Sequence, residues 1–201
     1  MNQLKEEIIN EIDVRINELS KIIRKTSQID DNYVNKFFLI AIYANWETFI
    51  KNSLRFYVNY LHNHDLLKNS NYISLIIKYE KLFERNLTDQ NQIKIILDKI
   101  DKININPKFD TNKIKFKIMN FDNTNKLFKE FNLPEFNRDN RIKLNTLVKQ
   151  RNWIAHGVQE VCLNDISVID IREYVNLIEE LMDEFLLNIL NYYDNNILGH
   201  V

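Results

Sequence analysis

The sequence predicts an all-α protein, and three observations lead to that prediction. Only two glycines and two prolines occur in 201 residues, too few for the many tight turns of a β-sandwich or barrel. Apolar residues recur at helical spacing in three long stretches. Hydrophobic residues make up 45% and charged residues 27% of the chain, a composition typical of globular proteins. We therefore expect a bundle of helices.

Two helices are expected in the first third of the chain. Residues 3–25 place isoleucine and leucine at helical spacing among charged residues, which predicts an amphipathic helix. Asp30 and Asp31 can cap a second helix that runs to about Leu61. Because this helix carries two apolar stripes, it should be central or lie in a subunit interface. Glu47 falls within one stripe, where a carboxylate needs a partner.

The helical pattern weakens between residues 62 and 137. We expect this part to form a less regular insertion within a single domain that covers residues 1–201. Residues 104–119 include an alternating stretch that fits either an edge strand or an extended loop. Candidate helices cover residues 73–85, 88–100 and 122–131.

The helical pattern returns after Arg138. Apolar residues from Ile142 to Ala155 predict a helix that ends at Gly157, because glycine accepts the left-handed conformation that ends helices. Ser167 and Asp170 then resemble a capping box at the start of a final helix. We expect this last helix to be the longest after the second.

Composition excludes several classes of protein. No apolar run approaches the ~20 residues that span a bilayer. The chain has too little glycine for a phosphate-binding loop, and His62 and His64 lack the companions of a metal site, so we expect neither cofactor nor metal. The single Cys162 excludes an intramolecular disulfide, and its apolar neighbours favour a packed side chain over a reactive thiol. Without a signal peptide, the cytoplasm is the expected compartment.

Charge and residue bias say little about function. The net charge of -1 gives no overall attraction to nucleic acid, so any RNA-binding surface has to be local. Arg138, Arg141 and Lys149, on or near the helix that ends at Gly157, are candidate RNA contacts, although a solvated helix face is the commoner role. We interpret the many asparagines as a coding bias of an AT-rich genome.

The helix that ends at Gly157 carries the residues most suited to chemistry. Arg151 lies on its apolar stripe, where a guanidinium needs an anion: either a buried ion pair, for instance with Glu47, or a bound phosphate. Asn152 and His156 are four residues apart and share a face, so the amide can orient the imidazole for acid–base catalysis. A histidine at this place is more often a partner of the helix dipole.

Arg151 and His156 do not share a face. Five residues at about 100° each separate them by roughly 140° around the helix. Either the last turn unwinds towards Gly157, or two copies of the chain meet and build one site together. We favour the second arrangement, with some contribution from the first.

Two motifs resemble a known family. The run Arg151-Asn152-x-x-x-His156 resembles the Arg-Asn-x-x-x-His signature of the HEPN superfamily, and its fuller form, Arg-Asn-x-Ile-Ala-His-Gly, is similar to that of small stand-alone bacterial members. The helix around Trp46-Glu47-Thr48-Phe49 is similar to a Trp-Glu-x-Phe helix of the same members. The two motifs occur in the expected order, about a hundred residues apart.

The resemblance implies an all-α HEPN-type bundle that dimerises through its motif face. Many members are metal-independent endoribonucleases of toxin–antitoxin, CRISPR and phage-defence systems, so the expected partners are RNA, a second copy and an antitoxin or other defence-system protein. Other members are non-catalytic modules that bind RNA, a nucleotide or a protein. By the resemblance His156 is the acid–base group, Arg151 neutralises the scissile phosphate, Asn152 orients His156, and Glu47 tethers Arg151 or adds a polar group.

One departure from the family pattern concerns regulation. Some HEPN toxins carry a tyrosine two residues after the histidine, where an antitoxin modifies it. This chain has Val158 there, so that scheme of regulation is not supported.

Overall fold

A computed structural model of the chain describes residues 2–29, 31–63, 114, 116–131, 133–157 and 165–197, with residues 62–63 and 192–197 described by their backbone alone. Several expectations therefore lie outside the described residues. They are the candidate helices 73–85 and 88–100, the capping role of Asp30, and the expectations for His64, Cys162 and Val158.

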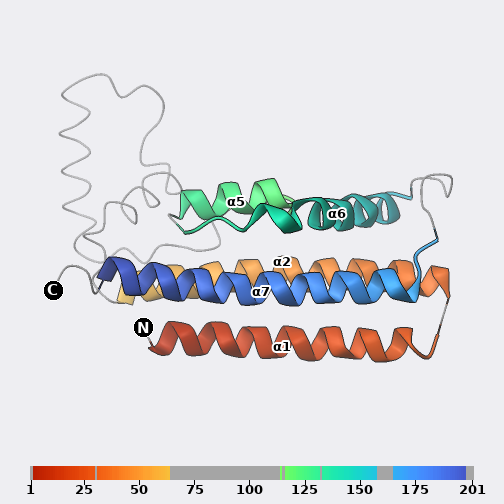
Figure 1. Ribbon diagram of the computed structural model, residues 1–201, viewed down its shortest axis with the longest axis horizontal. Helices are drawn as coiled ribbons and strands as arrows, with labels where there is room; N and C mark the ends of the chain where they lie inside the picture. Colours follow the sequence, from red (N-terminus) through yellow and green to blue (C-terminus); the bar gives the residue numbers. More distant parts are fainter. Residues whose placement is uncertain are drawn as a thin grey trace, which may run out of the picture.

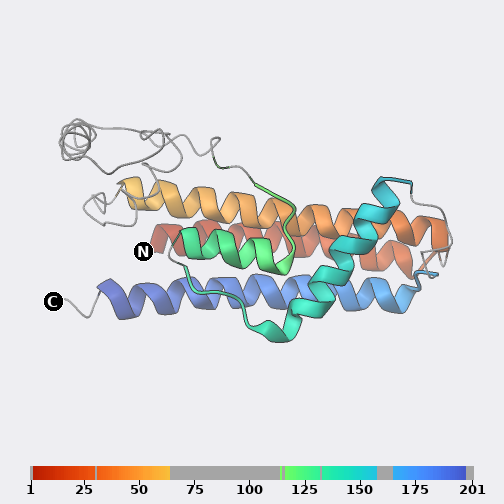
Figure 2. The ribbon, with the colours of Figure 1, turned by 90° about the horizontal axis from the view of Figure 1, so that it is seen from above.

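Three long helices lie lengthwise beside one another: α1 (Asn2–Thr26), α2 (Asn32–Asn63) and α7 (Val168–Ile197). Figure 1 shows that α2 and α7 run in the same direction and that α1 runs in the opposite one. A second layer covers α2 and α7, and Figure 2 shows its last helix crossing them obliquely. This layer consists of α5 (Phe121–Glu130), the short 3-10 helix η3 (Arg138–Asn140) and α6 (Arg141–Ala155). The predicted all-α fold is confirmed.

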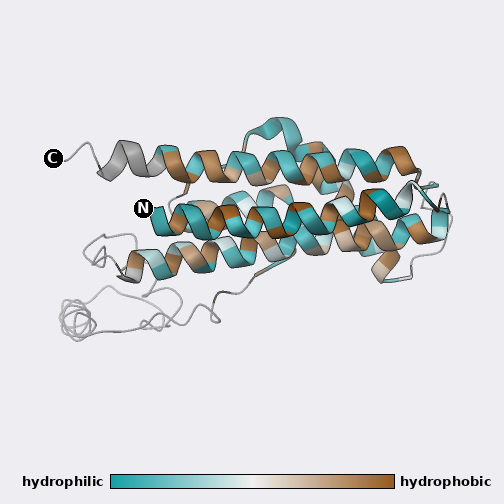
Figure 3. Ribbon diagram, turned by 90° about the horizontal axis from the view of Figure 1, so that it is seen from below, coloured by the Kyte–Doolittle hydropathy of each residue, from teal (hydrophilic) through white to brown (hydrophobic). Residues whose placement is uncertain are grey.

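Helix α2 is the central element of the bundle, as its two apolar stripes predict. It packs against α1, α6 and α7. An aromatic cluster from α2, α5, α7 and the segment between α5 and η3 fills the space between the layers, with neighbouring ring centroids 4.9 to 6.2 Å apart; it consists of Trp46, Phe49, Phe128, Phe136 and Phe185. Helix α1 is apolar on one side only, which Figure 3 shows as alternating colours along it. Ile142 at the start of α6 is 80% exposed and lies outside the buried face of that helix.

The predicted helix caps of α2 and α7 are present. Oδ1 of Asp31 accepts hydrogen bonds from the backbone N–H groups of Tyr33 (2.8 Å) and Val34 (3.1 Å), which have no partner within the helix. At α7, the Ser167 N–H donates to Asp170 (2.8 Å), and the Asp170 N–H donates to Oγ of Ser167 (3.2 Å). With 30 residues against 32 in α2, α7 is the second longest helix among the described residues.

Several asparagines hold connecting segments in place, so individual asparagines have structural roles that the sequence did not reveal. Nδ2 of Asn35, which is 1% exposed, donates to the carbonyl of Ile166 at 2.8 Å. Oδ1 of Asn32 accepts from the Ile166 N–H at 3.0 Å. These two bonds fix the segment that leads into α7 against the start of α2, and they satisfy backbone groups that burial would otherwise leave unpaired.

In the part of the alternating stretch that the structure describes, residues 114 and 116–119, no residue belongs to a strand, so the loop alternative holds there. Tyr43 and Trp46 of α2 each form one hydrogen bond with the backbone of Met119. The Met119 N–H donates to the Tyr43 hydroxyl (3.0 Å), and Nε1 of Trp46 donates to the Met119 carbonyl (3.0 Å). From α6, Oδ1 of Asn145 accepts from the Phe121 N–H at 3.0 Å. The loop is therefore fastened to both α2 and α6.

The Trp46 bond predicts a measurable loss of stability. Trp46 is fully buried, so Trp46→Phe replaces the packed indole with a smaller ring and leaves the Met119 carbonyl without its donor. We expect the free energy of unfolding to fall by about 2–4 kcal/mol in urea denaturation. Tyr33→Phe, at a residue that is 69% exposed, is the control and should change it by less than about 0.5 kcal/mol. If Trp46→Phe lowers the free energy of unfolding no more than the control does, the stabilising role of the Trp46–Met119 contact is contradicted.

Candidate functional site

Helix α6 ends where the sequence predicts. Its last residue is Ala155, and the N–H of His156 still donates to the carbonyl of Asn152 at 3.0 Å. Gly157 then has φ +62°, the left-handed conformation that costs a side-chain-bearing residue about 1–2 kcal/mol. The helix is intact up to His156, so unwinding of its last turn does not bring Arg151 and His156 onto one face.

The guanidinium of Arg151 packs on the ring of Tyr43 from α2. Its central carbon lies 4.6 Å from the ring centroid, and Nη1 donates to Oδ1 of Asn152 at 2.9 Å. Nε is buried without a hydrogen-bond partner in the described part of the chain. The π face and one amide oxygen are weak partners for a cation, so Arg151 keeps donor capacity for an anion.

Tyr43 is a site residue that the sequence analysis missed. It is 1% exposed, and burial raises the pKa of its phenol, an effect that the nearby charge of Glu47 reinforces and that the Met119 hydrogen bond and Arg151 oppose. The phenol therefore stays neutral, and its ring offers Arg151 a polarisable surface instead of a countercharge. A tyrosine within an aliphatic stripe, four residues before Glu47, was the available signal in the sequence.

The ion pair between Glu47 and Arg151, one of the alternatives that the sequence left open, is not formed among the described residues. Oε1 of Glu47 lies 2.8 Å from Nζ of Lys51, one turn further along α2, and the two side chains are about one quarter and one third exposed. Lysine four residues after glutamate is a favourable pairing on a helix, and it satisfies the carboxylate without a contact from α6. Glu47 is still close enough to act on the Tyr43 phenol, so it remains a polar neighbour of the candidate site.

A hydrogen bond holds the Asn152 side chain, whereas none holds the His156 side chain among the described residues. Asn152 is half-buried, and its carbonyl oxygen is taken by Arg151. His156 is exposed, and within the described residues its imidazole makes no hydrogen bond. The expected contact between the Asn152 amide and the imidazole is therefore not formed here. Asn152 positions Arg151, and the His156 ring is free to meet another molecule.

Two of the candidate RNA contacts, Lys149 and Arg141, lie on the exposed side of α6. Nζ of Lys149 lies 4.6 Å from the ring centroid of Trp153. Arg141 forms an ion pair with Asp122 of α5, 3.1 Å between Nη2 and Oδ1, in which both side chains are about half exposed. Exposed pairs of this kind contribute little to stability, so either cation can exchange its partner for a phosphate at small cost.

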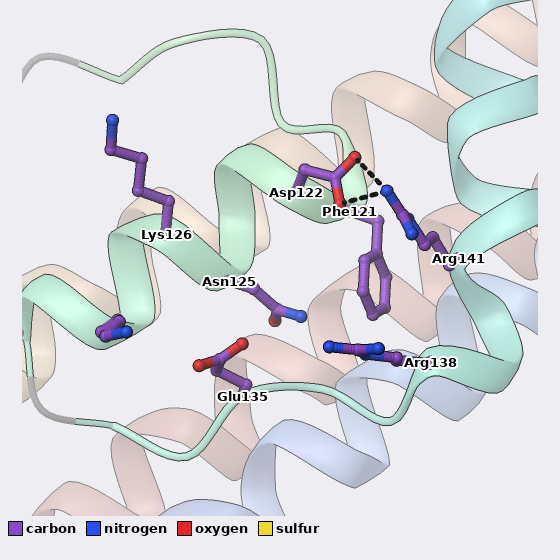
Figure 4. Close-up of a pocket in the computed structure, with 8 residues that line it drawn as sticks. Phe121, Asp122, Asn125, Lys126, Glu135, Arg138 and Arg141 are labelled. Carbon is purple, nitrogen blue, oxygen red and sulfur yellow. Dashed lines mark hydrogen bonds and ion pairs between the residues drawn. The ribbon is translucent and has the colours of Figure 1, made fainter.

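A hollow of about 340 Å³ lies at the junction of α5 and α6. Figure 4 shows the guanidinium of Arg138 beside the Phe121 ring, the Arg141–Asp122 pair, and Lys126 extending away from them. Four cationic and two acidic side chains line the hollow, a net charge of +2 on a chain whose net charge is -1: Lys126, Lys129, Arg138, Arg141, Asp122 and Glu135. Positive charge thus gathers on the α5–α6 side.

No group of three or more histidine, cysteine, aspartate or glutamate side chains in the described residues could hold a metal ion. In the same residues, no helix combines the length and apolar character that a membrane span requires.

Comparison with known proteins adds one finding to this geometry. Residues 7–191, almost the whole chain, match the model of the RiboL-PSP-HEPN family. The chain belongs to this family. As a HEPN protein, it belongs to a family of RNase-like or nucleotide-binding modules. No curated protein and no solved structure matches it.

The Tyr43–Arg151 contact can be measured by a double-mutant cycle in this HEPN protein. We expect Tyr43→Leu and Arg151→Gln to show a coupling of about 0.5–2 kcal/mol in the free energy of unfolding, because each removes one half of a cation–π pair. Tyr43→Phe keeps the ring and should retain the coupling. Additive losses for Tyr43→Leu and Arg151→Gln would show that the two side chains do not interact.

Proposed function

We propose that this HEPN protein is a metal-independent endoribonuclease, plausible as a toxin or phage-defence effector, that cleaves RNA with Arg151 and His156. One observation carries the proposal. Arg151 is held half-buried by Tyr43 and Asn152 with no carboxylate paired to it in the described residues, and an exposed histidine ends the same helix. An arginine fixed in place without a countercharge is suited to an anionic substrate.

The chemistry needs one proton carrier and one fixed positive charge. In the proposed reaction the RNA 2'-hydroxyl attacks the adjacent phosphorus, and the bond to the 5'-oxygen of the next nucleotide breaks. Imidazole can accept the proton of the 2'-hydroxyl or return one to the leaving oxygen, which is the role proposed for His156. Arg151 would neutralise the negative charge that develops on the phosphate. The products are a 2',3'-cyclic phosphate and a 5'-hydroxyl.

A second copy of the chain is part of the proposal. Arg151 turns towards Tyr43 on α2, whereas His156 lies at the exposed end of α6. Since the helix stays intact between them, one chain does not direct both side chains at one phosphate. A homodimer with twofold symmetry would bring the His156 of one copy to the Arg151 of the other.

The positive surface on the α5–α6 side supports RNA as the substrate. Arg138, Arg141 and Lys149 lie on this side of the protein and are exposed. Local positive charge attracts the RNA backbone even though the whole chain is slightly negative.

A non-catalytic HEPN module that binds RNA, a nucleotide or a protein is the second candidate. The free His156 imidazole favours it, because no described side chain orients the ring for catalysis. The two candidates differ in one measurable respect: the module binds its ligand without changing it.

Cleavage in the absence of metal separates the two candidates. Purified protein in excess EDTA should cut single-stranded RNA and leave 5'-hydroxyl ends, and His156→Ala should reduce the rate by at least about a hundredfold, the usual contribution of a general acid or base. Arg24→Ala, an exposed change on α1, is the control and should cleave like the wild type. Cleavage that requires added Mg²⁺, or that persists at full rate in His156→Ala, would refute the nuclease assignment.

A further inference from the structure

We propose that a hollow beside the HEPN motif binds one base of the RNA strand and sets a sequence preference. The inference rests on the proposed function and adds the specificity of the same site. The hollow has a volume of about 320 Å³ and lies between the loop that precedes α5, the start of α5 and residues 145–153 of α6. Its lining residues are Ile118, Asn120, Asn123, Asn145, Val148, Lys149, Asn152 and Trp153.

Four asparagines in this lining are fixed through one end of each amide. Oδ1 of Asn120 accepts from the Asn123 N–H (2.8 Å), and Nδ2 of Asn123 donates to the carbonyl of Ile118 (2.9 Å). On α6, Oδ1 of Asn145 accepts from the Phe121 N–H (3.0 Å). Oδ1 of Asn152 accepts from Arg151, as described above. The protein's own hydrogen bonds thus hold each amide plane in a set orientation.

The other end of each amide is without a partner among the described residues. The free groups are the NH₂ of Asn120, Asn145 and Asn152 and the carbonyl of Asn123. Each NH₂ can donate, so donors outnumber acceptors. A neutral, planar ligand with several acceptors on its edge matches this set. Uracil presents a carbonyl oxygen on each side of its N3–H, a pattern that NH₂ donors and one carbonyl acceptor can meet, whereas cytosine carries an amino group in place of one of these carbonyls.

Trp153 and Lys149 add the two other features of a nucleotide site. The half-buried indole of Trp153 offers a surface on which a base can stack. Lys149 is exposed, and its ammonium can leave the indole for the adjoining phosphate. No carboxylate lines the hollow, so nothing there repels the RNA backbone.

The position of the hollow links base binding to cleavage. Asn152 and Trp153 belong both to its lining and to the Arg151–Gly157 motif. His156 lies four residues beyond Asn152, a rise of about 6 Å along the helix. A base held in the hollow therefore places the neighbouring phosphates of the same strand beside the motif.

The test compares uridine and cytidine octanucleotides, because the two bases differ only at the edge that the amides would read. Binding is measured on His156→Ala protein by fluorescence anisotropy, so no cleavage is needed. We expect uridine RNA to bind more tightly by about fivefold or more, within the range of one well-placed base contact. Equal binding of the two RNAs, or binding of neither, overturns the proposal.

Asn145→Asp provides the decisive variant. The carboxylate can still accept from the Phe121 N–H, but it replaces the NH₂ donor with an acceptor that suits the cytosine amino group. The preference for uridine RNA should therefore vanish or reverse. Thr146→Asp is the matched control. It adds the same charge at the next residue, which is exposed and outside this hollow, and it should weaken the binding of both RNAs equally.

The results distinguish this proposal from the nuclease assignment. An unchanged preference in Asn145→Asp, with wild-type protein that cleaves in EDTA, overturns the base site and leaves the nuclease standing. A shifted preference in a protein that does not cleave supports the base site and rejects the nuclease.

Discussion

The rest of the candidate site depends on the contacts of Tyr43. Its hydroxyl accepts from the Met119 N–H, which fastens the loop before α5 to the central helix, and its ring carries the guanidinium of Arg151, which fastens α6 to the same place. Trp46, about one turn further along α2, donates a hydrogen bond to the Met119 carbonyl. One buried tyrosine thus joins three segments that are far apart in the sequence, so the Trp-Glu-x-Phe helix and the Arg-Asn-x-x-x-His helix are parts of one structural unit.

This arrangement sets the geometry of Arg151 and leaves His156 independent of it. The arginine is held by an aromatic face and an amide oxygen, contacts that orient a guanidinium without neutralising it. The histidine follows the last turn of the helix and precedes a glycine with positive φ. Because α6 does not unwind, the two groups face different directions, and the proposed cleavage requires a second chain to bring them to one phosphate.

Periodicity and capping residues predicted much of this fold. The bounds of α1, α2, α6 and α7, the Asp31 cap, the Ser167–Asp170 capping box and the stop at Gly157 depend on local chemistry that the sequence shows directly. The partner of Arg151 was not predictable, since a helix pattern places a side chain on a face but does not identify what lies opposite. Glu47 has the right charge for Arg151 but pairs with Lys51 on its own helix, and the asparagine contacts join residues too distant in sequence for any local pattern to reveal.

A mixing experiment tests the two-chain site most directly. His156→Ala and Arg151→Ala proteins, each inactive alone in EDTA, are denatured together, refolded and assayed on RNA. If each site takes Arg151 from one chain and His156 from the other, a mixed dimer keeps one intact site, and an equimolar mixture should recover about one quarter of wild-type activity by random pairing. A mixture that stays as inactive as its components, while co-refolded wild-type protein regains full activity, would contradict a site built from two chains.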